Sequence, residues 1–68
     1  MTKSNLKSLG QKIKGLRNKR GLSQVELAVI VGISSSYVGS IEQGLRHPSL
    51  KVLEKIARAL KTDLKELF

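Results

Sequence analysis

Apolar residues recur along this chain at the spacing of amphipathic helices. Over residues 5–19 they follow one another at steps of three, four and three, as Leu6, Leu9, Ile13 and Leu16. This spacing places them on one face of a helix. A similar stripe over residues 50–60 consists of Leu53, Ile56 or Ala57, and Leu60. The pattern predicts a helix at each end of the chain and an all-α fold.

The segment between these two helices, residues 24–43, has the most informative pattern. It reads QVELAVIVGISSSYVGSIEQ. The first half has core spacing at Leu27, Ala28 and Val31, and the second half has it at Val38 and Ile41. Between them stands a glycine, which can adopt the positive φ that ends a helix. Two short helices with a small residue where they cross predict a helix-turn-helix at about residues 24–43.

Capping residues set the expected ends of the helices. Ser4 is the expected N-cap of the first helix and Gly21 follows its end. The second helix opens with a capping box formed by Ser23 and Glu26. The remaining boundaries are Ser34 at the start of the third helix, Gly44 after its end, Ser49 before the fourth helix, and a last short helix over residues 64–68. This gives a compact five-helix domain over residues 1–68.

Size and charge limit what such a domain does. The chain has no cysteine and one histidine, so we expect no disulfide and no metal site. Its five acidic residues are spread along the helices, so we expect no catalytic residues, no cofactor and no enzyme activity. Thirteen Lys and Arg give a net charge of +8, which indicates a polyanionic partner. No segment resembles a membrane span or a signal peptide, so a cytoplasmic location is expected.

The third helix is the candidate for reading DNA. Its positions outside the core include four serines, Ser34, Ser35, Ser36 and Ser40. Short polar side chains near a helix N-terminus are suited to the base edges of the major groove. Gln24 stands at the start of the second helix, where free N–H groups attract phosphate. Arg46 and His47 follow the third helix and are further candidates for phosphate contact.

Three segments of the chain closely resemble the Xre family of phage-repressor and Cro-type helix-turn-helix domains, which also includes restriction–modification controller proteins. They read RNKRGLSQVELA, VGISSSYVGSIEQG and HPSLKVLEKIARAL. The resemblance implies a domain that binds operator DNA as a two-fold dimer, with the four serines at base-reading positions. It implies phosphate contacts for Gln24 and Gln43, with Arg46 nearby. It also implies an ion pair between Arg17 and Glu42.

The chain departs from the family pattern at two places. Gly39 stands where members have a polar or larger residue, and Val29 and Ile30 stand where they have polar or charged residues. Together with Val25, these two aliphatic residues could form a patch for a partner protein. The sequence therefore leaves open an antitoxin or adaptor module that binds protein, and a basic peptide that binds a membrane surface. No sensor domain is visible in these 68 residues, so no small-molecule ligand is expected.

A homodimer requires a surface away from the third helix. The first helix is occupied by its apolar stripe and its basic face, and the N-terminus of the second should face DNA. The C-terminal end remains, where Leu64, Leu67 and Phe68 are three large apolar residues within five positions. We expect Leu64 to complete the core, and Leu67 and Phe68 to form the dimer contact. The alternative dimer surface is the loop and helix start at residues 45–52.

Overall fold

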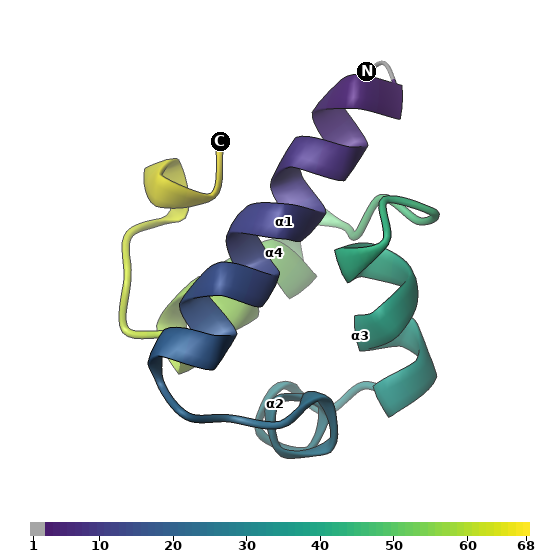
Figure 1. Cartoon of the computed structure of the whole chain (residues 1–68). Coiled ribbons are helices and arrows are strands. Elements are labelled where there is room, and N and C mark those ends of the chain that lie inside the picture. The colour runs from purple at the N-terminus through teal and green to yellow at the C-terminus, as the bar shows by residue number, and fades with distance from the viewer. Residues whose placement is uncertain (1–2) are drawn as a thin grey trace.

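The structure is a computed structural model that describes residues 3–68, with side chains described from residue 5 onward, and it is helical throughout (Figure 1). Its elements are α1 (Lys3–Lys19), α2 (Gln24–Val31), α3 (Ser35–Glu42), α4 (Leu50–Ala59) and the 3-10 helix η1 (Leu64–Leu67). No strand occurs within residues 3–68, which confirms the predicted all-α class. The fifth helix is a single 3-10 turn of four residues. A segment this short, with no side-chain cap from Asp63, closes the tighter i→i+3 turn.

Local capping chemistry explains most helix boundaries. Ser23 Oγ accepts the N–H of Glu26, and Glu26 Oε1 accepts the N–H of Ser23, at 3.0 and 2.8 Å. The backbone N–H and then the hydroxyl of Ser23 stabilise the charged carboxylate, so the pKa of Glu26 lies below its ordinary value. Ser34 and Ser49 cap α3 and α4 as predicted. The prediction for Ser4 was wrong, because α1 already begins at Lys3 and position 4 lies inside it.

The apolar stripes of all five elements meet in one core. Its buried members are Leu9, Ile13, Leu27, Ala28, Val31, Val38, Ile41, Leu53, Ile56, Ala57, Leu60 and Leu67. Leu67 has 0% of its surface exposed. The prediction that it forms a dimer contact was therefore wrong, since η1 packs against both α1 and α4 and carries this side chain into the core. Phe68 remains 55% exposed.

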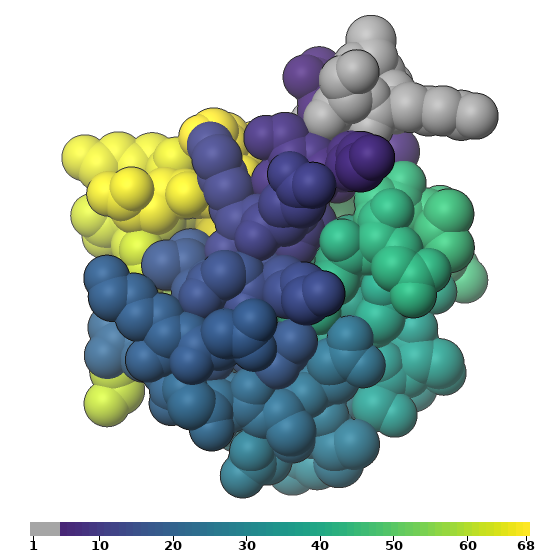
Figure 2. Space-filling model, viewed as in Figure 1, coloured from purple at the N-terminus to yellow at the C-terminus, as the bar shows by residue number. Residues whose placement is uncertain are grey.

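α1 lies between α3 and the C-terminal segment. Figures 1 and 2 show α3 along one flank of α1 and the C-terminal segment, in yellow, along the other. The approach to α3 is very close, because a Cβ atom at Gly10 would lie 2.4 Å from the carbonyl oxygen of Ile41. Gly44 meets the start of α1 near Lys7 with a φ of 77°. Glycine at these two positions lets the backbones touch.

No single helix within the described residues has the length and apolar character needed to cross a membrane. The two helices α2 and α3 reach that length and composition only as a pair bent by 111°.

Candidate nucleic-acid interface

The α2–α3 pair has the geometry of a helix-turn-helix. The two helices are bent by 111°, within the range of about 90–120° for this motif. Gly32 ends α2 in the left-handed region with a φ of 83°. The N–H groups of Gly32 and Ile33 both donate to the carbonyl oxygen of Ala28, at 2.8 and 3.0 Å. This turn fixes the crossing angle and directs the outer face of α3 to the surface.

The outer face of α3 carries the predicted serines. Ser34, Ser35 and Ser36 are exposed, and Ser40 is half-buried. A shallow hollow of about 350 Å³ is lined by Ser34, Ser36, Tyr37, Ser40 and Arg46. Ser34 also caps the helix, because its Oγ accepts the N–H of Tyr37 at 3.0 Å. The structure thus brings three of the four serines together with Arg46, while Ser35 stands exposed outside this lining.

Tyr37 also belongs to this surface and was not among the residues predicted from the sequence. The Arg46 guanidinium carbon lies 5.2 Å from the centre of the Tyr37 ring, a distance at which a cation is attracted to the ring face. Tyr37 stands three residues after Ser34 and three before Ser40. That spacing puts all three on the same side of α3 and was the signal that could have identified it.

Arg17 and Glu42 form the expected ion pair and join α1 to α3. Arg17 Nε lies 2.7 Å from Glu42 Oε2, and Arg17 Nη2 donates to Glu42 Oε1 at 3.1 Å. Both side chains are buried. Arg17 Nη1 also donates to the carbonyl oxygen of Leu22 at 2.6 Å. The hydrogen bond to Glu42 raises the pKa of Arg17 despite burial, so the guanidinium stays charged.

The candidate phosphate contacts differ in how free their side chains are. Gln24 Nε2 donates to Glu42 Oε1 at 3.1 Å, so its amide is directed into the protein. Because Ser23 Oγ takes the N–H of Glu26, the backbone N–H groups in the first turn of α2 that remain without a partner within the described residues are those of Gln24 and Val25. Gln43, Arg46 and His47 are exposed at the end of α3 and in the following loop.

The positive charge is not on the helix-turn-helix itself. Neither α2 nor α3 contains a Lys or Arg residue. The thirteen cations instead lie on α1 and in the turn after it, in the loop at Arg46, on α4 and in the C-terminal segment. The surface formed by α3 therefore presents uncharged groups, and Arg46 is the cation next to it.

Comparison with known proteins agrees with this geometry. The model of a helix-turn-helix family matches residues 13–67, which is most of the chain. The chain belongs to this Xre-type helix-turn-helix family. The proteins related to this chain are transcriptional regulators, which are not enzymes.

Three Xre-family relatives illustrate the similarity. The crystal structure of the restriction–modification controller protein C.AhdI from Aeromonas hydrophila superposes with a TM-score of 0.93, at 43% identity over 96% of this chain and 98% of that one. The regulator of biofilm formation SinR, solved in complex with DNA, gives a TM-score of 0.82 at 40% identity over 87% of this chain and 95% of that one. The immunity repressor of Bacillus phage phi105 is 45% identical over 53 residues, 78% of this chain.

The chain spans only part of several curated relatives. It covers 37% of the phage phi105 repressor and 40% and 54% of the Bacillus subtilis regulators SlrR and SinR.

Proposed function

We propose that this chain is a sequence-specific DNA-binding transcriptional regulator that acts in the cytoplasm and places α3 in the major groove of a palindromic operator. The observation that carries this proposal is the uncharged serine face of α3, exposed beside Arg46 and free of acidic groups. The SinR structure, which contains DNA, and the repressor and controller relatives support it. In this proposal Ser34, Ser35, Ser36 and Ser40 contact base edges.

The phosphate contacts position α3. Arg46 and His47 flank α3 on the loop side, and Gln43 ends it. At the start of α2, the free backbone N–H groups of Gln24 and Val25 bind a phosphate, while the Gln24 side chain donates to Glu42. The cation–π contact between Arg46 and the Tyr37 ring keeps the guanidinium at the edge of the outer face of α3.

The size of the molecule favours a dimer. Its Cα atoms extend over 28 Å along the longest axis and it has a single α3, whereas successive major grooves on one side of DNA are ~34 Å apart. One copy therefore presents a single α3 to one groove. Two copies related by a two-fold axis present two such helices and read a palindromic site.

The surface around the α3–α4 loop is the better candidate for the dimer contact. Leu45 and Leu50 are 70% and 61% exposed, close to α3. Phe68 is also exposed, and the Lys12 ammonium lies beside it. Arg46 and Lys51 neighbour the two loop leucines, so like charge does not choose between the surfaces, but the loop offers two exposed leucines against one phenylalanine. We therefore place the contact at Leu45 and Leu50.

Sedimentation of variants tests this contact. We expect the double change Leu45→Ser with Leu50→Ser to yield a folded monomer at concentrations where the parent is dimeric. Phe68→Ser, which removes another exposed apolar side chain, should remain dimeric. A monomeric Phe68→Ser protein beside a dimeric loop variant would move the contact to the C-terminal segment.

Binding should depend steeply on salt. If each subunit contacts ~3 phosphates, the slope of log K against log salt is about −5 for the dimer. Arg46→Ala should make the slope shallower by about 2, because two phosphate contacts are lost, and weaken all DNA sequences alike. Lys19→Ala removes the same charge on the far flank of α1 and should leave the slope unchanged. The measurement is fluorescence anisotropy of labelled duplexes, and a parent slope shallower than about −2 would exclude the groove-binding proposal.

A second candidate function, a protein-binding antitoxin or adaptor, is favoured by one observation. Val25, Val29 and Ile30 are 59%, 75% and 57% exposed on α2. The anisotropy experiment distinguishes the two functions, since an adaptor has no steep salt-dependent DNA binding.

A further inference from the structure

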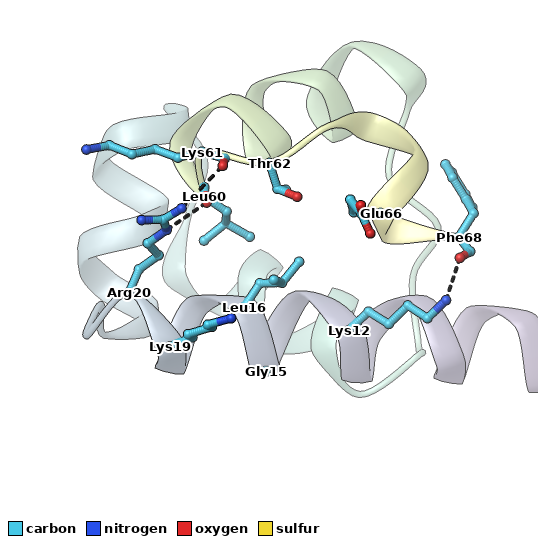
Figure 3. Close-up of a pocket in the computed structure, with 10 residues that line it drawn as sticks. All are labelled: Lys12, Gly15, Leu16, Lys19, Arg20, Leu60, Lys61, Thr62, Glu66 and Phe68. Carbon is cyan, nitrogen blue, oxygen red and sulfur yellow. Dashed lines mark hydrogen bonds between the residues drawn. The ribbon is translucent and has the colours of Figure 1, made fainter.

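A cleft of about 660 Å³ lies between α1 and the C-terminal segment, on the flank of α1 opposite α3 (Figure 3). Hydrogen bonds close its two ends. At one end Arg20 Nε and Nη2 donate to the carbonyl oxygens of Leu60 and Lys61, at 2.9 and 3.2 Å. At the other end Lys12 Nζ donates to the carbonyl oxygen of Phe68. These hydrogen bonds connect α1 to the C-terminal segment at both ends of the cleft.

Its lining combines positive charge with apolar surface. Figure 3 shows Arg20 at one end of the cleft between Lys61, whose side chain extends outward, and Lys19, whose side chain runs towards Leu16; Leu16 projects from α1 into the middle of the cleft. The ammonium groups of Lys19 and Lys61 take part in no ion pair within the described residues. Arg20 has two of its nitrogens held by carbonyl oxygens, and Nη1 remains for an anion. Glu66 is the single acidic side chain of the lining.

Gly15 lies in the same cleft and has no role in the packing of the chain. A Cβ atom there would have no other atom within 4 Å, unlike the one at Gly10, which would meet backbone. Glycine in the middle of a helix is unfavourable relative to alanine. The absent side chain leaves the middle of the cleft open beside Leu16.

We propose that this cleft binds a phosphate monoester with an apolar body, such as an alkyl or aryl phosphate. The phosphate is held by the free Nη1 of Arg20, with the ammonium groups of Lys19 and Lys61 on either side of it, because guanidinium and ammonium groups suit a dianion. The apolar body lies across Leu16 and Gly15 towards Phe68. A second copy of this chain is disfavoured there by like charge, and DNA bound to α3 lies on the other flank. The domain would then bind a small-molecule ligand, which was not expected from the sequence.

Titration with octyl phosphate, followed by amide NMR shifts without DNA, tests this site. We expect saturable shifts at Gly15, Lys19 and Thr62, with Ser35 and Ser36 unaffected. Inorganic phosphate should bind at least about tenfold more weakly, and octanol should cause no comparable shifts. The same titration is repeated with an acidic peptide of alternating glutamate and leucine. If this peptide binds the cleft more tightly than octyl phosphate, the proposed ligand class is wrong.

Matched variants separate the cleft from general positive charge. Lys19→Gln with Lys61→Gln should weaken octyl phosphate binding by about tenfold or more. Lys51→Gln with Lys55→Gln, which removes the same charge from α4, should change it by less than about twofold. Gly15→Leu should weaken binding of octyl phosphate but not of inorganic phosphate, with the fold checked by circular dichroism. Equal losses in both double variants, or shifts confined to α3 and Arg46, would overturn the proposal. Either result can arise whether or not α3 binds DNA.

Discussion

Replacing Glu42 with alanine is expected to lower the free energy of unfolding by about 3–5 kcal/mol. The change leaves the Arg17 guanidinium buried without its carboxylate, and this is the costly half of breaking a buried ion pair. It also removes the acceptor of Gln24 Nε2. Such a loss is comparable to the whole stability of a small domain. Urea unfolding followed by circular dichroism measures it.

A double-mutant cycle shows whether the loss comes from the pair. Arg17→Ala with Glu42→Ala should cost less than the sum of the two single changes, since neither charge is then left alone. Glu54→Ala removes an exposed carboxylate from α4 and should change stability by less than about 1 kcal/mol. Strictly additive effects below about 1 kcal/mol for Arg17 and Glu42 would show that the pair does not join α1 to α3 in solution.

The second large effect is expected at Gly10. In Gly10→Ala the new Cβ would lie 2.4 Å from the Ile41 carbonyl oxygen and 2.5 Å from that of Glu42. These are backbone atoms, so α1 and α3 must move apart, and we expect a loss of about 1–3 kcal/mol. The displacement also disturbs the Arg17–Glu42 pair, which spans the same contact. Thermal and urea unfolding measure the change.

Gly15 provides the matched control for Gly10. It lies in the same helix, and a Cβ there meets nothing within 4 Å. Gly15→Ala should therefore stabilise the protein by about 0.5–1 kcal/mol through helix propensity. The two identical substitutions should have opposite signs. A neutral Gly10→Ala would mean that the close α1–α3 approach is not present in solution.

The parts of the fold that depend on local chemistry were predictable from sequence. The capping box at Ser23 and the caps at Ser34 and Ser49 act within one helical turn, so their residue types predict the boundaries that the structure has. The apolar stripes likewise indicate which positions are buried. The Arg17–Glu42 pair was predicted only through the family resemblance, because residues 25 positions apart have no local signal that joins them.

The features that depend on tertiary contacts were not predictable. Leu67 looked like a spare apolar residue at the chain end, and only the packing of η1 on α1 and α4 shows it in the core. The Gln24 side chain was expected to contact phosphate, but in the fold its amide donates to Glu42 of α3. The stacking of Arg46 on Tyr37 depends on the path of the loop after α3.

Base reading by the outer face of α3 is tested most directly by comparing one selected operator with random DNA. The operator is obtained by selecting bound duplexes from a random library, and affinities are measured at fixed salt for the parent, Ser35→Ala, Ser36→Ala and Arg46→Ala. We expect each serine variant to lose ~1–2 kcal/mol of affinity for the selected operator and much less for random DNA, because base contacts carry the discrimination. Arg46→Ala should lose similar affinity for both. Equal losses on both DNAs for the serine variants, or no selected sequence at all, would contradict the account.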